Sequence, residues 1–262
     1  MNVDATPPLA PPPADARRGV PRRHGAANMD DPPARLMQRR QWHPRSDRAP
    51  LPPLTRGEGP GEGSVRAILF AAGESRRMGE PKPLLPWYGE PLVVYQVRQL
   101  REAGAVEVVV VVGHEAAVVG PIAEAAGGRV VENALYRSGR ASSVRAGALA
   151  LPDDTLAVVT LNVDQPRPVV LVRRVIEAHL ASGALITTPE EGGRRGHPVI
   201  FAGSLLPELR TVSEQGEGLR AVVRGHAGRR FLAPIDDPII HLEFNTPEEY
   251  AAALAAIGVT QP

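Results

Sequence analysis

A glycine-containing, basic loop near residue 70 has the composition of a phosphate-binding segment. It reads Ala71-Ala72-Gly73-Glu74-Ser75-Arg76-Arg77-Met78-Gly79-Glu80-Pro81-Lys82 and follows an apolar run. Glycines let a backbone approach an anion closely, exposed N–H groups can bind phosphate oxygens, and Arg77 and Lys82 supply positive charge. The spacing does not match the Walker A loop, the dinucleotide-binding glycine loop or the hydrolase nucleophile elbow. The loop therefore predicts a phosphate site of another kind.

Lys82 is the only lysine among the 30 basic residues of the chain. A compact ammonium group can reach one phosphate oxygen in a way that a planar guanidinium cannot. A lone lysine could also persist by chance in a chain that prefers arginine. Its position in this loop favours a catalytic role.

Asp164 is the first candidate metal ligand, because it comes directly after the apolar run 157–163. Ligands of open α/β sheets bind beyond the carboxyl ends of the strands, so we expect Asp164 to face the same crevice as the loop at Gly73. A carboxylate there suits Mg²⁺, although an aspartate could also start a turn before Pro166.

Short β-branched runs alternate with helical periodicity from Ser64 onward, which predicts an α/β fold with a mostly parallel sheet. Thr246, Pro247 and Glu249 are typical of a helix start, and that helix is expected to end near Gly258. Strands are expected at 66–72, 106–112, 129–132, 157–163, 185–188, 198–201, 230–233 and 239–242. Other helices are expected at 91–103, 116–126, 142–150 and 169–181.

The overall composition excludes several classes of protein. The 262 residues carry 30 Lys+Arg against 29 Asp+Glu, and this balance disfavours a polybasic partner of nucleic acid or of an anionic membrane. No apolar run reaches the ~20 residues of a membrane-spanning helix. The absence of cysteine excludes disulfides, cysteine-ligated metals and a thiolate nucleophile, and it is compatible with a cytoplasmic location.

Residues 1–63 differ in composition from the rest of the chain. They hold 13 of the 28 prolines and 10 arginines but few large apolar residues. Such a segment cannot bury enough apolar surface to offset the entropy lost on ordering, so we predict a disordered extension. It could be a partner-binding tail or a dispensable extension. Residues 64–262 are then the predicted catalytic domain.

Five segments together resemble the nucleotidyltransferase superfamily, and most of all its molybdenum cofactor cytidylyltransferase group. They are Phe70 to Gly79 with Pro81-Lys82-Pro83-Leu84-Leu85, Gly139 to Gly147, Asp164-Gln165-Pro166, Gly196-His197-Pro198-Val199, and Asn245-Thr246-Pro247-Glu248-Glu249-Tyr250. The resemblance implies a Rossmann-like three-layer fold of the nucleotide-diphospho-sugar transferase type. It also implies Mg²⁺-dependent transfer of a nucleotidyl group, from CTP in preference, to a phosphorylated small molecule such as molybdopterin cofactor, with release of pyrophosphate.

The same resemblance implies roles for individual residues. Asn245 would be a second metal ligand beside Asp164, although many relatives have aspartate there and Glu243 could serve instead. Arg77, Lys82 and Asp164 would be the catalytic residues. The nucleotide or acceptor would be bound by Ala71, Ala72, Gly73, Ser75, Ser143 and His197.

Three details leave alternatives open. Ser142 and Ser143 are predicted to open a helix, and one of them would act as its cap. Arg194 and Arg195 could bind an acceptor phosphate or belong to a solvated loop. The run Gln215-Gly216-Glu217-Gly218-Leu219-Arg220 stands where the cofactor-specific relatives commonly have Gly-Asp-x-Gly-Ala-Arg. The acceptor could therefore be a sugar phosphate or a small phosphoacid, or the chain could be a nucleotide-binding module with weak catalysis.

Overall fold

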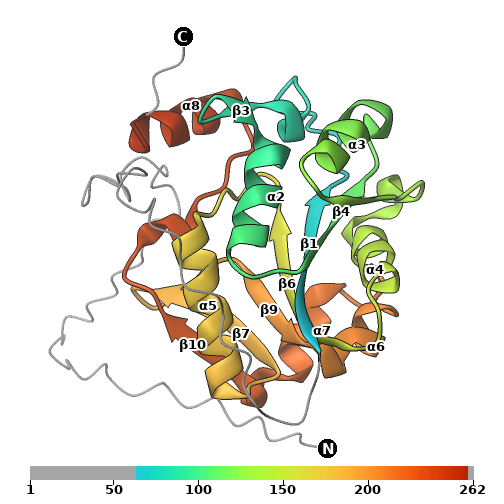
Figure 1. Cartoon of the computed structure of the whole chain (residues 1–262), viewed down its shortest axis with the longest axis vertical. Helices are drawn as coiled ribbons and strands as arrows, with labels where there is room; N and C mark the ends of the chain where they lie inside the picture. The colour runs from blue at the N-terminus through green and yellow to red at the C-terminus, as the bar shows by residue number, and fades with distance from the viewer. Residues whose placement is uncertain (1–62, 259–262) are drawn as a thin grey trace, which may run out of the picture. The chain divides into compact units, whose positions relative to one another are not determined.

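In the computed structural model, which describes residues 63–258, strands and helices alternate along most of the chain (Figure 1). The prediction of a disordered extension concerns residues that, apart from Gly63, lie outside this range. The strands are β1 (Ser64–Ala71), β2 (Pro86–Trp87), β3 (Glu90–Pro91), β4 (Glu107–Val112), β5 (Arg129–Glu132), β6 (Thr155–Asn162), β7 (Ile186–Glu191), β8 (Arg194–Arg195), β9 (Val199–Ala202) and β10 (Arg230–Pro234). The α-helices are α2 (Leu92–Glu102), α3 (Ala116–Ala125), α4 (Arg140–Ala150), α5 (Val169–Ser182), α6 (Leu206–Leu209), α7 (Leu219–Gly225) and α8 (Pro247–Ala256).

Strand β1 lies inside the main sheet, whose order is β10-β7-β9-β6-β1-β4-β5 with β8 paired to β7. β1 is parallel to both of its neighbours, β4 and β6, and only β8 and β9 run antiparallel to the strands beside them. The chain passes from β1 through β4 to β5 on one side, then returns past β1 to β6. The loops after β1 and β6 therefore leave the sheet where the strand order reverses, which is the usual ligand site of such sheets.

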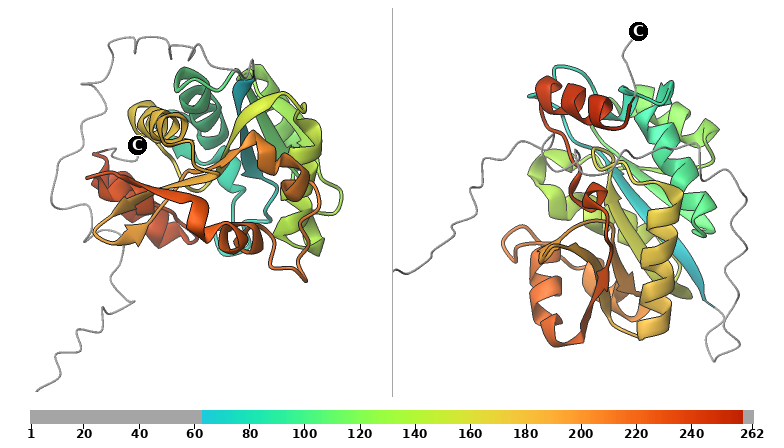
Figure 2. Two further views of the ribbon diagram at one scale, coloured as in Figure 1. Left: turned by 90° about the horizontal axis from the view of Figure 1, so that it is seen from below. Right: turned by 90° about the vertical axis from the view of Figure 1, so that its left-hand side faces the viewer.

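Helices cover both faces of the sheet, and the two layers are visible in Figure 2. The buried side chains of β1 alternate between two cores: Leu69 belongs to the core that includes residues of α2, α3, α5 and α8, and Ile68 belongs to the core that includes residues of α4, α6 and α7. This arrangement confirms the predicted three-layer α/β fold. The longest helix, α5, has 14 residues, and no helix of residues 63–258 is long and apolar enough to cross a membrane.

Most predicted elements agree with the structure, and the exceptions are the segment near residue 240 and the start of α4. Residues 239–242 were expected to be a strand, but Pro238–His241 form a 3-10 helix. The Asp237 side chain accepts a hydrogen bond from the Ile239 N–H, and Pro238 has a fixed φ that suits the first helical position. The expected strand is therefore wrong, because the capping residues before this apolar run favour a helical turn. The short helices α6 and α7 were not predicted.

Candidate active site

The loop after β1 forms one wall of a cavity of about 320 Å³ at the carboxyl edge of the sheet. We call it the first cavity. The start of α4 and the end of β6 also line it. Its lining includes Ala71, Ala72, Gly73, Ser75, Lys82, Tyr136, Gly139, Arg140, Ser143, Asn162 and Asp164.

Ser75 folds the loop so that Lys82 returns to the first cavity. Its carbonyl accepts a hydrogen bond from the Met78 N–H at 2.8 Å, and its Oγ accepts one from the Lys82 N–H at 2.9 Å. A Cβ atom added at Gly73 would meet no protein atom within 4 Å. Packing within the protein therefore does not require glycine at position 73, whereas a ligand lying against the backbone would.

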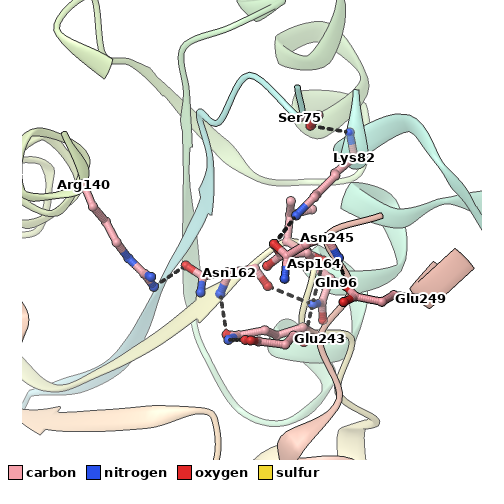
Figure 3. A network of polar contacts seen from close by, with 11 residues as sticks. Ser75, Lys82, Gln96, Arg140, Asn162, Asp164, Glu243, Asn245 and Glu249 are labelled. Carbon is pink, nitrogen blue, oxygen red and sulfur yellow. Dashed lines mark hydrogen bonds and ion pairs between the residues drawn. The ribbon is translucent and has the colours of Figure 1, made fainter. Parts of the chain in front are cut away.

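Lys82 lies between two oxygen-bearing side chains from distant parts of the sequence (Figure 3). Its Nζ donates to Asp164 Oδ2 at 2.6 Å and to Asn245 Oδ1 at 3.0 Å. The side chains of Lys82 and Asp164 are only 12% and 20% exposed, so this ion pair is shielded from solvent. Glu243 is exposed and accepts a hydrogen bond from Gln165 at 3.0 Å. The structure thus brings Asn245, and not Glu243, to the same point as Asp164.

The oxygen atoms around Lys82 can be tested for their fit to a metal ion. One carboxylate and one amide oxygen point at a single position that holds a cation, the Lys82 ammonium. Within residues 63–258, no group of three or more His, Asp or Glu side chains forms a complete metal site. Mg²⁺ commonly uses one or two protein oxygens together with water and substrate phosphates. Asp164 and Asn245 therefore fit a metal ion that is held jointly with a nucleotide.

A buried polar side chain of α2 holds the turn that carries Asp164. Gln96 of α2 is fully buried, and its Nε2 donates to the Gln165 carbonyl at 2.7 Å. Its Oε1 accepts a hydrogen bond from the Arg167 N–H at 3.3 Å. The Gln96 side chain therefore fastens the backbone directly after Asp164 to α2.

Arg167 connects three segments around the site although it is completely buried. Its guanidinium donates to four backbone carbonyls, those of Pro166, His197, Ile240 and Leu242, at distances of 2.8–3.0 Å. Burial lowers the pKa of Arg167 to about 9, which still leaves it charged at neutral pH. The side chain thus ties the Asp164 turn to the loop of His197 and to the segment that leads into Asn245.

Aromatic packing and a helix cap position Asn245. The preceding residue, Phe244, is buried and stacks on Trp87 with ring centroids 5.7 Å apart. The following residue, Thr246, accepts a hydrogen bond from the Glu249 N–H, which confirms the predicted cap of α8. The Glu249 carboxylate in turn accepts a hydrogen bond from the Asn245 N–H at 2.6 Å. The backbone of Asn245 is therefore held on both sides.

The start of α4 differs from the prediction. The helix begins at Arg140 after Gly139, whose φ of 114° strongly favours glycine and which supplies no side-chain cap. The prediction that Ser142 or Ser143 caps the helix is wrong, because both lie inside the first turn. Ser142 Oγ donates to the Gly139 carbonyl at 2.7 Å, whereas Ser143 Oγ accepts from Asn133 at 3.0 Å. Ser143 also lines the first cavity.

A second cavity of about 780 Å³ adjoins the first one. The two cavities share Phe70, Arg140 and Asn162 as lining residues. Arg140 donates to Asn162 Oδ1 at 2.6 Å, a contact visible in Figure 3. Arg140 therefore marks the boundary where a ligand in one cavity would meet a ligand in the other.

His197 lines the second cavity and not the first. Burial, together with the positive charge of Arg167, lowers the pKa of His197 to about 3, so its ring is neutral at pH 7. Arg195 also lines the second cavity, whereas Arg194 does not. Arg77 is exposed and lines neither cavity. Apart from Arg77 and Asn245, the predicted site residues line one of the two cavities, and Asn245 reaches the site through its contact with Lys82.

Sequence reasoning missed four polar residues of the site, namely Gln96, Arg140, Asn162 and Arg167. Arg140 and Arg167 stand next to recognised motif residues, and Asn162 is the last residue of a strand. These positions were the available signals. Nothing in the local sequence around Gln96 indicates that it reaches the Asp164 turn, because that contact depends on the packing of α2.

Comparison with known proteins identifies the domain. The model of the MobA-like NTP transferase domain matches residues 67–230. An enzyme named nicotine blue oxidoreductase from Paenarthrobacter nicotinovorans is 34% identical over 167 residues, which are 61% of this chain and 81% of that protein. A molybdenum cofactor guanylyltransferase from Xanthomonas euvesicatoria pv. vesicatoria is 51% identical over 43 residues, which are 16% of this chain and 23% of that enzyme.

The solved structure of Rv0371c from Mycobacterium tuberculosis H37Rv has the same fold. It superposes with a TM-score of 0.64 over 74% of this chain and 98% of its own, at 23% sequence identity. This likeness confirms the nucleotide-diphospho-sugar transferase type of fold that the sequence predicted.

Proposed function

The chain belongs to the MobA-like NTP transferase family, and from that premise we propose that it moves a nucleoside monophosphate from a triphosphate to a phosphorylated small molecule. One observation carries the proposal, the convergence of Asp164 and Asn245 on the ammonium of Lys82 beside the Gly73 loop. CTP is the first candidate donor and GTP the second. We propose that the reaction takes place in the cytoplasm, with which the absence of cysteine is compatible.

In the proposed reaction, an acceptor phosphate oxygen attacks the α-phosphorus of the nucleotide. The bond from the α-phosphorus to the oxygen that bridges it to the β-phosphate breaks, and pyrophosphate leaves with the electron pair. Both partners are anions, so positioning and electrostatic stabilisation are the main requirements and no general base is obligatory. A bound Mg²⁺ would neutralise charge on the phosphate oxygens.

The residues of the chain supply the rest of the stabilisation. Asp164 and Asn245 would hold the metal with the nucleotide phosphates, and this would release Lys82 to bind a phosphate oxygen. Backbone N–H groups of the loop, with Lys82, would draw negative charge towards the leaving pyrophosphate. Arg77 is exposed on the same loop, and we propose that it contacts the triphosphate only after binding.

The second cavity suits an anionic acceptor. Five arginines and two glutamates line it, which leaves a net charge of +3, and the His197 ring is neutral at pH 7. The resemblance to molybdenum cofactor enzymes makes molybdopterin cofactor the first acceptor to test. A sugar phosphate or a small phosphoacid remains the alternative, since the segment around Glu217 lines this cavity and departs from those relatives.

The proposal is tested by release of pyrophosphate. The full chain is incubated with each of the four nucleoside triphosphates, with Mg²⁺ or Mn²⁺, and with one acceptor class at a time. We expect pyrophosphate to form only when metal, nucleotide and a phosphorylated acceptor are all present. Tight nucleotide binding without pyrophosphate from any acceptor would instead identify a binding module with weak catalysis.

The chain is 34% identical to a protein named as an oxidoreductase, and the match covers 81% of that protein. This favours a second candidate function, that of a redox enzyme that uses the same nucleotide cavity. The chain has no thiol to carry electrons, so a nicotinamide or flavin nucleotide would have to supply them. Oxidation of NADH or NADPH in the presence of a dye acceptor measures this activity. A loss of absorbance at 340 nm that needs the protein, without pyrophosphate release, would favour this second candidate.

A further inference from the structure

The arginines of the second cavity differ in whether a carboxylate neutralises them. Arg224 forms an ion pair with Glu217 at 2.8 Å. Within residues 63–258, no carboxylate pairs with Arg195, Arg220 or Arg230. These three side chains therefore leave positive charge in the cavity.

The two glutamates of this cavity are already engaged. Glu217 pairs with Arg224, and the Glu214 carboxylate accepts a hydrogen bond from the Ala141 N–H at the start of α4. A Cβ atom at Gly139 would lie 2.4 Å from the Glu214 side chain, so Glu214 is packed closely against that turn. Neither carboxylate is free to neutralise the remaining arginines without breaking a contact.

The arginines form two groups on different elements. Arg140 and Arg220 lie at the starts of α4 and α7, and Arg140 reaches the boundary with the first cavity. Arg195 and Arg230 lie on β8 and β10, both of which pair with β7. Strand β9 separates β7 from β6, so β7 lies about 10 Å from β6 at a strand spacing of ~4.8 Å.

Each group brings like charges together. Burial lowers the pKa of Arg230, and the positive charge of Arg195 lowers it further. Burial likewise lowers the pKa of Arg140; the carboxylates of Asp164 and Glu243 oppose this effect, and the positive charge of Arg220 adds to it. Guanidinium groups gathered in one cavity without carboxylate partners are the arrangement expected of an anion-binding site, because an anion relieves their repulsion and can accept paired hydrogen bonds.

Strand geometry separates Arg195 from its neighbour Arg194. Successive side chains on a strand point to opposite faces, and only Arg195 lines the second cavity. Glu190 is opposite Arg195 in the β7–β8 register, but the two side chains form no ion pair. The charge of Arg195 is therefore directed to the cavity.

We propose that the acceptor carries two separate anionic groups. The reacting phosphate binds beside Arg140 and Arg220 at the boundary of the two cavities, and a second phosphate or carboxylate binds between Arg195 and Arg230. This inference rests on the proposed function, because it names the class of acceptor that the second cavity takes. It makes Arg195 and Arg230 specificity-determining residues, which act on acceptor choice and not on the nucleotide.

The test measures binding, so it does not require turnover. Isothermal titration calorimetry compares pentyl phosphate with the bisphosphates of 1,3-propanediol, 1,5-pentanediol and 1,7-heptanediol on the full chain. At least one bisphosphate should bind about 10-fold or more tightly than the monophosphate. Equal affinities across the series would overturn the proposal, while pyrophosphate release in the separate turnover assay would still support the proposed function.

Matched variants distinguish a specific anion site from nonspecific attraction by positive charge. Arg195→Gln and Arg230→Gln should each remove most of the bisphosphate advantage and leave pentyl phosphate binding unchanged. Arg194→Gln and Arg229→Gln remove the same charge from exposed neighbours outside the cavity and should preserve the advantage. The proposal would be contradicted if both cavity variants still bound a bisphosphate more tightly than pentyl phosphate. It would also be contradicted if the control variants lost this difference in affinity to the same extent. Melting temperatures confirm that each variant is folded.

Discussion

Replacement of Lys82 by arginine keeps the charge but changes the shape of the cation. In the native side chain, Nζ lies 2.6 Å from Asp164 Oδ2 and 3.0 Å from Asn245 Oδ1. A planar guanidinium does not fit between these two oxygens as a compact ammonium does, and after metal binding it does not reach a single phosphate oxygen in the same way. Loss of one charged hydrogen bond costs about 1.5 kcal/mol, which corresponds to about a 10-fold fall in turnover. Lys82→Met removes the charged donor entirely and should cost about 3 kcal/mol, or roughly 100-fold.

Two readouts test this prediction. The first is kcat/KM for pyrophosphate release, with the melting temperature as the control for folding. The second uses an amine-directed reagent, because only Lys82 and the amino terminus can react. A bound nucleotide with Mg²⁺ should slow the labelling of Lys82. A fully active Lys82→Arg enzyme, together with a labelling rate that saturating nucleotide does not change, would refute the assignment of Lys82 to the site.

The other predictions concern the metal ligands, two buried side chains and the amino-terminal segment. Asp164→Ala should lower metal-dependent turnover by about 100-fold with little change in melting temperature, whereas Asn245→Asp should stay active because it supplies a stronger oxygen ligand. Arg167→Met should lower the free energy of unfolding by about 3 kcal/mol in urea denaturation, since it leaves four buried carbonyls without their donor. Burial lowers the pKa of His179 from 6.5 to about 4, so the unfolded chain takes up the proton first as the pH falls. Stability should therefore decrease between pH 6.5 and 4, by up to ~1.4 kcal/mol per pH unit, and His179→Gln should lessen this decrease. Deletion of residues 1–63 should leave the melting temperature and the nucleotide affinity unchanged.

Each of these predictions has a clear contrary result. Normal turnover of Asp164→Ala at low Mg²⁺ would remove that residue from the metal site. An Arg167→Met protein as stable as the wild type would show that the four carbonyl contacts contribute little. If His179→Gln loses stability just as steeply as the pH falls, the loss is due to other groups. A large fall in melting temperature on deletion of residues 1–63 would contradict the prediction of a disordered extension.

Local sequence predicted the parts of the site that depend on strand ends. Asp164 and the Gly73 loop could be placed at one edge because the carboxyl ends of parallel strands meet there. Arg167 could not be predicted, since an arginine is usually exposed and its burial requires three segments to present carbonyls to it. The roles of Arg194 and Arg195 were equally open in the sequence. The pairing of β8 with β7 distinguishes them, and that pairing is a tertiary property.

The extent of α4 and the segment near Ile240 were misjudged for a common reason. At both places a residue with special backbone geometry decides the outcome, Gly139 through its positive φ and Pro238 through its fixed φ. The apolar pattern alone does not reveal these backbone constraints. The start of α4 lines the second cavity, whose lining also depends on the short helix α7 that periodicity did not indicate.

The most direct test of the central claim follows a label through the reaction. The full chain is incubated with a triphosphate labelled with ³²P at the α-position, Mg²⁺ and the acceptor that supports pyrophosphate release. Nucleotidyl transfer predicts that labelled acceptor and unlabelled pyrophosphate form in equal amounts, and that Asp164→Ala reduces both together. Release of inorganic phosphate in place of pyrophosphate, or pyrophosphate without label in the acceptor, would contradict the account.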